Sequence, residues 1–154
     1  CGTGLMLPVL SKFAGKVYAV DHAEKMLQLA EKRCDQLGID NVEFIQNPIN
    51  EIKDIQACDA VLLHFVLHQV ASPQSLISSL KPILKKGGRL VIVDRQKHDD
   101  EHARDKFGSI WLGFDKEQIS SWLSEISADI QYQEFASSNA GGKISSFIIS
   151  AVID

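Results

Sequence analysis

The sequence predicts an α/β fold with a doubly wound, mostly parallel sheet that ends in an antiparallel hairpin. Short β-rich runs alternate with stretches whose apolar residues recur at helical spacing, a pattern typical of parallel strands joined by helices. The run at 89–93 is almost continuously apolar, as expected for a buried parallel strand. Two later strand-like runs flank the glycine-containing stretch 137–142, which indicates the hairpin.

Each expected element follows from its local pattern. The expected strands lie at 16–20, 42–46, 60–63, 89–93, 130–136 and 144–152. The expected helices begin with one that has Pro8 in its first turns and continue at 23–37, 72–84, 98–110 and 116–126. Gly38 should end the second helix, and residues 86–88 should form a turn into the strand at 89–93.

Length and composition indicate one globular domain over residues 1–154. Hydrophobic residues make up 45% of the chain and its formal net charge is -4, which argues against a nucleic-acid or anionic-membrane partner and favours a small-molecule one. The three cysteines, Cys1, Cys34 and Cys58, lack metal-ligand spacing. We therefore expect reduced thiols, no metal site and a cytoplasmic location.

Glycines at positions 2 and 4 are the first candidate ligand-binding residues. Such a turn lets backbone approach a ligand, but it is as often only a tight turn. Asp21 ends the next strand, where its carboxylate could bind ribose hydroxyls or, alternatively, start the following helix. Together these residues favour a nucleoside cofactor. Leu7 occupies the position where a dinucleotide fingerprint needs its third glycine, so NAD is disfavoured.

Four stretches, in order, resemble the motifs of class I S-adenosylmethionine-dependent methyltransferases. They are CGTG at 1–4, VDHAEKML at 20–27, DAVLLHFVLH at 59–68 and LKPILKKGGRL at 80–90. The resemblance covers residues 1–94 and implies a Rossmann-like fold with S-adenosylmethionine as cofactor. The cofactor-binding residues that it implies are Cys1, Gly2, Thr3, Gly4, Asp21, His22, Met26, Asn47, Pro48, Ile49, His64 and Phe65.

Two departures from the family pattern affect these expectations. Asn47, Pro48 and Ile49 stand where the family often has Gly-Asp-Ala for adenine, and the side-chain amide of Asn47 is the candidate substitute. The family's first strand would precede Cys1. We therefore expect an N-terminally truncated domain whose cofactor loop lacks its usual lead-in, and a fragment that is a poor enzyme even if its parent is active.

The segment 98–114 resembles a subgroup of quinone-biosynthesis-type methyltransferases and domains attached to arsenic-responsive-type winged-helix regulators. Because this segment follows the strand whose carboxyl end faces the cofactor cleft, we expect it to form a lid or wall over the acceptor pocket, with His98, Arg104 and Trp111 as substrate residues. An upstream regulator domain or a homodimer is the further expected partner. The alternative is that its aromatic residues are core and its charges a solvated face.

Methyl transfer from a sulfonium needs no covalent nucleophile, so the expected catalytic group is at most a general base. The candidates are His64, His68 and His98, although a histidine in such a position is more often structural. Cys34 and Cys58 fit buried, inert thiols better than nucleophiles. The sequence thus predicts methyl transfer to a small-molecule acceptor. A regulatory cofactor-binding module without catalysis and a nucleotide-dependent oxidoreductase remain as alternatives.

Overall fold

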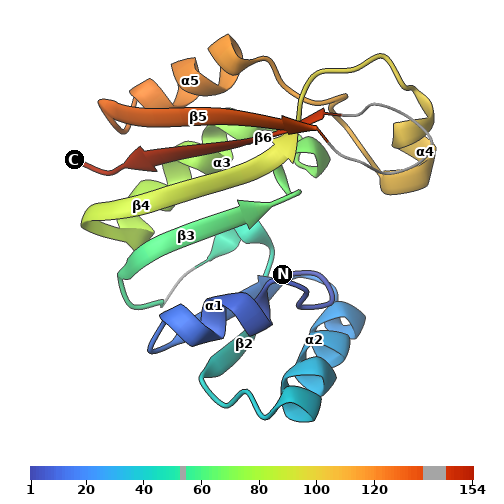
Figure 1. The fold of residues 1–154 in the computed structure, drawn as a ribbon, viewed down its shortest axis with the longest axis vertical. Coiled ribbons are helices and arrows are strands. Elements are labelled where there is room, and N and C mark those ends of the chain that lie inside the picture. The colour runs from blue at the N-terminus through green and yellow to red at the C-terminus, as the bar shows by residue number, and fades with distance from the viewer. Residues whose placement is uncertain (53–54, 137–144) are drawn as a thin grey trace. The chain divides into compact units, whose positions relative to one another are not determined.

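The computed structural model describes residues 1–52, 55–136 and 145–154 (Figure 1). The chain divides into two compact units, Cys1–Ile55 and Gln56–Asp154, which we call unit 1 and unit 2. Within the described ranges, no helix is long and apolar enough to cross a membrane. The expected loop at 137–142 lies outside these ranges.

Unit 1 is a pair of parallel strands packed with two helices. Its elements are α1 (Leu7–Phe13), β1 (Val17–Asp21), α2 (Glu24–Leu37), β2 (Val42–Gln46) and the 3-10 turn η1 (Ile49–Glu51). The two strands run in register from one end to the other, so both finish at the same edge of the sheet. Gly38 ends α2 in the left-handed conformation, as predicted. The core consists of Leu7, Val17, Ala19, Ala30 and Cys34.

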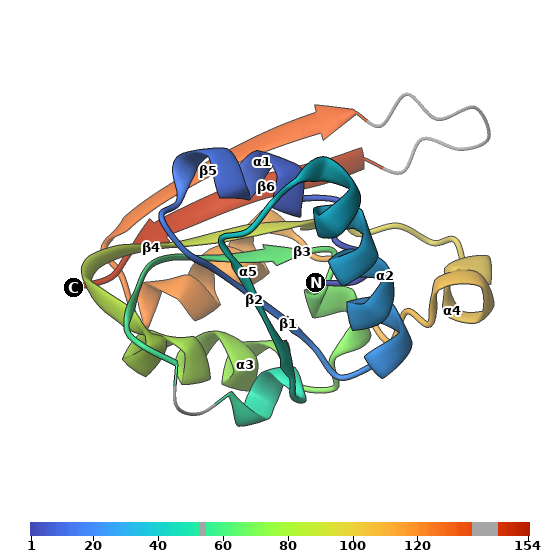
Figure 2. The ribbon, with the colours of Figure 1, turned by 90° about the horizontal axis from the view of Figure 1, so that it is seen from below.

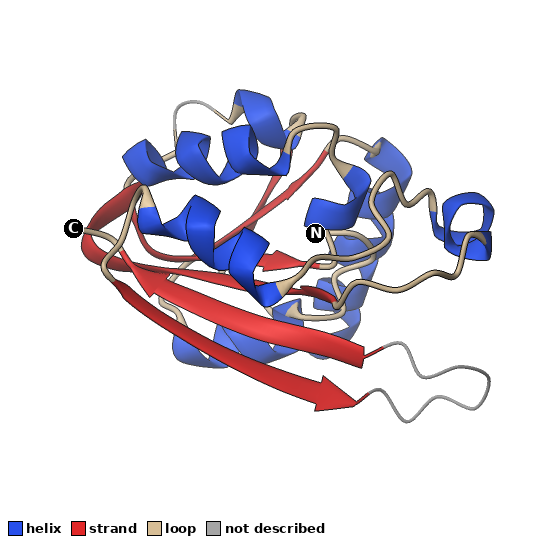
Figure 3. Cartoon of the chain, turned by 90° about the horizontal axis from the view of Figure 1, so that it is seen from above, coloured by secondary structure: helices blue, strands red, loops and turns tan. Residues whose placement is uncertain are grey.

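Unit 2 contains a four-stranded mixed sheet in the order β3-β4-β6-β5. Its strands are β3 (Cys58–His64), β4 (Leu84–Arg95), β5 (Asp129–Ala136) and β6 (Ser145–Val152), and its helices are α3 (Pro73–Leu80), α4 (His102–Phe107) and α5 (Lys116–Ser124). Strands β3 and β4 are parallel, whereas β6 pairs antiparallel with both β4 and β5. Helices α3 and α5 lie together on one face of this sheet (Figure 3).

The α/β class and the antiparallel C-terminal hairpin are confirmed. Among the described residues the strands are hydrogen-bonded as two sheets, β1-β2 in unit 1 and the four strands of unit 2. Each sheet contains one parallel pair of strands. Within each pair, the carboxyl ends of the two strands lie at the same edge of their own sheet.

Two predicted helices are shorter than expected, for local chemical reasons. Helix α3 ends at Leu80 and a 3-10 turn covers Lys81–Ile83, because Pro82 has no N–H to continue an α-helix. The helix predicted at 98–110 is confined to α4. The carboxylate of Asp100 accepts the N–H of His102 where α4 begins, and Gly108, with φ 65°, ends it.

The turn predicted at 86–88 is a bulge inside β4. Pairing between β3 and β4 passes from Cys58 opposite Leu84 to Ala60 opposite Arg89, which leaves extra residues on β4. A Cβ at Gly88 would lie 2.7 Å from the carbonyl oxygen of Lys85, so this position requires glycine. The buried strand predicted at 89–93 continues beyond the bulge.

Candidate functional site

The glycine loop of unit 1 precedes α1 and contains two left-handed residues, Gly2 with φ 57° and Gly4 with φ 73°. A Cβ at Gly4 would lie 2.9 Å from both the Ala30 Cβ and the Leu7 Cδ1, so Gly4 lets the loop pack against α2. A Cβ at Gly2 would meet nothing within 4 Å. Gly4 therefore serves packing, whereas Gly2 is the point where the loop leaves room beside its backbone.

Asp21 joins this loop to the end of β1. One carboxylate oxygen accepts the N–H of Gly2 at 2.7 Å and the backbone nitrogen of Cys1 at 3.1 Å, and the other accepts the N–H of Ala23 at 3.0 Å. Partial burial would raise the pKa of Asp21, but these hydrogen bonds, from Ala23 first, hold the pKa below its usual value. The carboxylate is ionised at neutral pH. It does not cap α2, whose N-cap is Ala23 and has no side-chain capping hydrogen bond.

Arg33 and Ala30 hold the loop from α2, and the sequence analysis missed both. The Nε of Arg33 donates to the carbonyl oxygen of Thr3 at 2.9 Å, and Ala30 packs beneath Gly4. The two residues are three apart on α2 and so share one face of the helix. This helical spacing is the feature of the sequence that could have indicated a shared contact with the loop.

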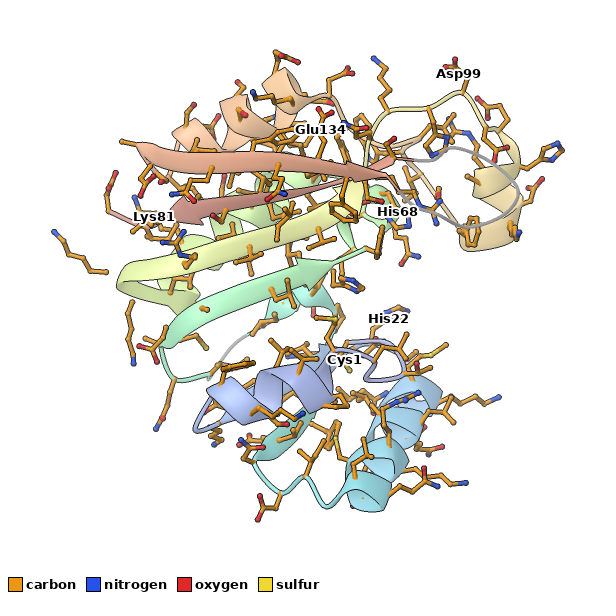
Figure 4. All side chains as sticks on the ribbon, in the orientation of Figure 1. Cys1, His22, His68, Lys81, Asp99 and Glu134 are labelled. Carbon is orange, nitrogen blue, oxygen red and sulfur yellow. The ribbon has the colours of Figure 1, made fainter. Side chains whose placement is uncertain are left out.

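The other expected cofactor residues of unit 1 lie near the same strand ends but differ in exposure. His22 follows Asp21 with its side chain 81% exposed (Figure 4). Met26, in the first turn of α2, is also exposed. The N–H of Asn47 donates to the carbonyl oxygen of Asp21 at 3.0 Å. Its side-chain amide donates to the carbonyl oxygen of Glu51, across the turn that begins after Pro48 with Ile49.

In unit 2, the exit of β3 has a strained backbone. Phe65 follows His64 and has φ 55°, the one positive φ at a non-glycine residue in the described ranges. Such a conformation costs about 1–2 kcal/mol and tends to occur at functional sites. The N–H of Phe65 donates to the carbonyl oxygen of Val93, which anchors the exit of β3 to β4. Burial lowers the pKa of His64, with the Asp94 carboxylate opposing the shift.

A buried histidine–aspartate pair follows this exit. The Nδ1 of His68 lies 2.8 Å from Asp94, and the two residues are 2% and 0% exposed. Asp94 also accepts the backbone N–H groups of His68 and Arg95. The Asp94 carboxylate serves as acceptor, so His68 donates through Nδ1, and its Nε2 has no hydrogen-bond partner among the described residues. The sequence analysis proposed His68 but missed Asp94, whose position at the end of an apolar strand was the available signal.

The segment after β4 folds back over the ends of β3 and β4. The N–H of His98 donates to the Leu112 carbonyl oxygen, and the carbonyl oxygen of His68 accepts the N–H groups of Ile110 and Trp111. The indole N–H of Trp111 donates to the Val70 carbonyl oxygen at 3.0 Å. Figure 2 shows α4 beyond the carboxyl ends of these strands. The segment 98–114 therefore lies at the edge of the sheet where ligands of parallel strands bind.

The three substrate residues predicted in this segment have different surroundings. Trp111 packs in an aromatic group with Phe114 and Trp122. Arg104 is engaged within the segment, because it donates to the Glu101 carboxylate and to the Ile110 carbonyl oxygen. His98 accepts the N–H of Asp100 through Nδ1 and leaves Nε2 buried and unpartnered among the described residues.

The cysteines do not form a nucleophilic site. Burial is the main cause that raises the pKa of the Cys34 and Cys58 thiols, which disfavours a thiolate at neutral pH. Cys34 is buried in the core of unit 1, but Cys58 is only half-buried at the start of β3.

The parallel strands of unit 1, with a glycine loop and an aspartate at a strand end, define a nucleotide-binding α/β class. A family model described as a methyltransferase domain matches residues 1–139, and the chain belongs to this family. The chain is 34% identical over 94 residues to a demethylmenaquinone methyltransferase of Clavibacter sepedonicus, a match that covers 60% of this chain and 38% of the relative.

Two further comparisons agree with this family. A ubiquinone biosynthesis O-methyltransferase of Acinetobacter baylyi is 27% identical over 92 residues, covering 58% of this chain and 39% of the relative. The matched regions are thus under half the length of these curated relatives. A crystal structure of a SAM-dependent methyltransferase from Aquifex aeolicus has a TM-score of 0.74 and 27% identity, over 99% of this chain and 78% of that one.

Proposed function

We propose that this chain, as a single methyltransferase domain, transfers a methyl group from S-adenosylmethionine to a small-molecule acceptor in the cytoplasm. The observation that carries the proposal is the Asp21 carboxylate, fixed at the end of β1 and bonded to the N–H of Gly2. Membership of the methyltransferase domain family supports it, as do relatives named for quinone biosynthesis.

The residues of unit 1 fit this cofactor. Asp21 is ionised and still has lone pairs that can accept ribose hydroxyl groups, and Gly2 leaves open space beside the loop. The side-chain amide of Asn47 is occupied by Glu51, which favours backbone and apolar contacts to the adenine over an amide one. When bound, S-adenosylmethionine supplies a methyl group already activated by its sulfonium.

We propose that His68 is the general base for an acceptor that must lose a proton. Asp94 holds the imidazole ring by Nδ1, while Nε2 takes the proton from the acceptor's O–H or N–H. The proton is thereby held at a defined atom of unit 2. In this proposal the segment 98–114 forms a wall of the acceptor site. Trp111→Ala should therefore alter acceptor binding more than cofactor binding.

Calorimetry with S-adenosylhomocysteine tests the cofactor assignment. Asp21→Ala should weaken binding by roughly 1.5–3 kcal/mol, because it removes charge-assisted hydrogen bonds to ribose and frees the Gly2 amide. Asp40→Ala, an exposed aspartate of the same unit, should bind like the wild type. Unchanged affinity in Asp21→Ala would remove this residue from the site. Binding of NAD in place of S-adenosylhomocysteine would instead support an oxidoreductase.

Methyl transfer to a panel of small phenols and amines tests the base. His68→Gln should lower kcat by about 10²–10⁴-fold while S-adenosylhomocysteine affinity is kept. The fall should be greatest for acceptors whose proton has the highest pKa. His102→Gln, an exposed histidine of α4, serves as the control. Cofactor binding without transfer to any acceptor would favour a regulatory module.

A further inference from the structure

Three buried polar side-chain atoms in the described part of the chain have no hydrogen-bond partner. They are Nη1 of Arg95, Nε2 of His98 and Oγ of Ser109, all within residues 95–109 of unit 2. Ser109 is only 4% exposed. Native proteins pair nearly all buried polar groups, and each unpaired group needs an explanation. Their grouping in one short segment at the end of β4 points to a ligand that is absent here.

The hydrogen bonds of His98 define what this ligand offers. The backbone N–H of Asp100 donates to Nδ1 of His98 at 3.2 Å, so Nδ1 carries no proton. Burial, followed by the charge of Arg95, lowers the pKa of His98, while Asp99 and Asp100 oppose this and His68 adds to it. The neutral ring therefore bears its proton on Nε2. This buried N–H lacks an acceptor.

Arg95 is a second donor in the same neighbourhood, since its charge acts on His98. Its guanidinium lies 4.3 Å from the ring centroid of Phe107, and no carboxylate pairs with it among the described residues. The adjacent Asp94 is already bonded to His68 and to backbone amides. Within the described part of the chain, the half-buried guanidinium of Arg95 thus has no carboxylate partner.

We propose that Arg95 and His98, with Ser109 as a third donor, bind the carboxylate of a small organic acid, and that this acid is the methyl acceptor. The part about the acceptor rests on the proposed function. Donors without acceptors need an oxygen acceptor, and the cation beside them favours one that carries a negative charge. The ring of Phe107 beside Arg95 favours an acid with an apolar or aromatic body. The N–H of Ile110, which follows Ser109, donates to the carbonyl oxygen of His68, and this contact keeps the carboxylate subsite near the base.

Binding of benzoate and benzamide to the full chain, without cofactor, tests the subsite. NMR titration of the imidazole should show that benzoate raises the pKa of His98 by about one unit, because a nearby anion favours the imidazolium. Benzamide has the same ring without the charge and should leave the pKa unchanged. Arg95→Gln should weaken benzoate binding about tenfold or more. Arg89→Gln, an exposed arginine of the same strand, should bind benzoate normally.

Several results would overturn the proposal. These are no benzoate effect on His98 in the wild type, an equal effect of benzamide, or inorganic phosphate binding as tightly as benzoate, which would indicate a general anion site. The wild-type titrations remain decisive even if Arg95→Gln folds poorly. S-adenosylhomocysteine affinity, measured in parallel, separates the two proposals. If the wild type does not bind S-adenosylhomocysteine, the cofactor assignment is refuted and the result on carboxylate binding still stands.

Discussion

The two units differ in how they satisfy the polar groups of their candidate sites. In unit 1, backbone N–H groups occupy both carboxylate oxygens of Asp21, and Arg33 bonds the loop at Thr3. In unit 2, buried donors of Arg95 and His98 are without partners in the described part of the chain. The comparison teaches that unit 1 can form its site from its own backbone, whereas unit 2 presents groups that a ligand would complete.

The difference has a structural origin. The donors to Asp21 come from residues that a loop and a strand end hold in place, so little side-chain entropy is lost. The unpartnered donors of unit 2 are at the ends of side chains, on the last residue of β4 and on the following segment, whose only helix in the described ranges is the short α4. We therefore expect ligand binding to order unit 2 more than unit 1. The buried His68–Asp94 pair is the rigid exception in unit 2.

The largest expected effect comes from removing Asp94 from the buried His68–Asp94 pair. Asp94→Ala should destabilise unit 2 by about 3–5 kcal/mol, because it leaves the His68 side chain and two backbone N–H groups buried without their acceptor. Asp105→Ala, an exposed aspartate of α4, should change stability by less than about 0.5 kcal/mol. If both variants lose the same small amount of stability, the His68–Asp94 pair contributes little to the stability of unit 2.

Urea unfolding measures this effect in unit 2 specifically. The chain has two tryptophans, Trp111 and Trp122, and both belong to unit 2. Their fluorescence therefore reports the unfolding of that unit.

Two glycines of the cofactor loop give the next largest effect, and they form a matched pair in unit 1. Gly4→Ala should cost about 2–4 kcal/mol, since its Cβ would meet Ala30 and Leu7 at 2.9 Å in a left-handed conformation. Gly2→Ala has open space and should cost only about 1 kcal/mol of backbone strain. Circular dichroism and S-adenosylhomocysteine calorimetry distinguish the two. Equal losses of stability would contradict the packing role assigned to Gly4.

The fold could be predicted from periodicity because strand and helix patterns are local. The bounds of β2 match the expected 42–46, and Gly38 ends α2 as its sequence position indicates. Helix ends were less predictable, because Pro82 removes a single N–H donor and the Asp100 carboxylate adds a single hydrogen bond. The bulge of β4 depends on pairing with a distant strand, which periodicity does not contain.

The candidate site was predictable only where one motif holds its residues. Asp21 could be placed because a strand end and a glycine loop define its position. Asp94 could not, since its role depends on His68, which lies 26 residues earlier in the chain. The unpartnered donors of Arg95 and His98 are equally invisible in the sequence, because burial and the missing acceptors are properties of the folded segment.

The two units should lose stability in different pH ranges as the pH falls, because the groups with shifted pKa values differ between them. Burial lowers the pKa of His64 in the folded state, so below about pH 6.5 the unfolded chain binds a proton that the folded unit 2 resists. Stability is thus lost as the pH falls from 6.5. The pKa of Asp21 is also lowered, but from 3.8, so its contribution to unit 1 is lost only below that pH.

The smallest expected effect is therefore a change in how steeply the unfolding free energy of unit 2 falls with pH, and not a change in its stability at neutral pH. Between pH 7.5 and 5, the unfolding free energy reported by tryptophan fluorescence should fall less in His64→Gln than in the wild type. One proton corresponds to at most about 1.4 kcal/mol per pH unit, and solvent access to His64 reduces this share. His102→Gln, which removes an exposed histidine of α4, controls for the substitution itself. Parallel curves for wild type and His64→Gln would show that burial of His64 does not couple folding to protons, and the contrast in pH range between the units would then have to come from other groups.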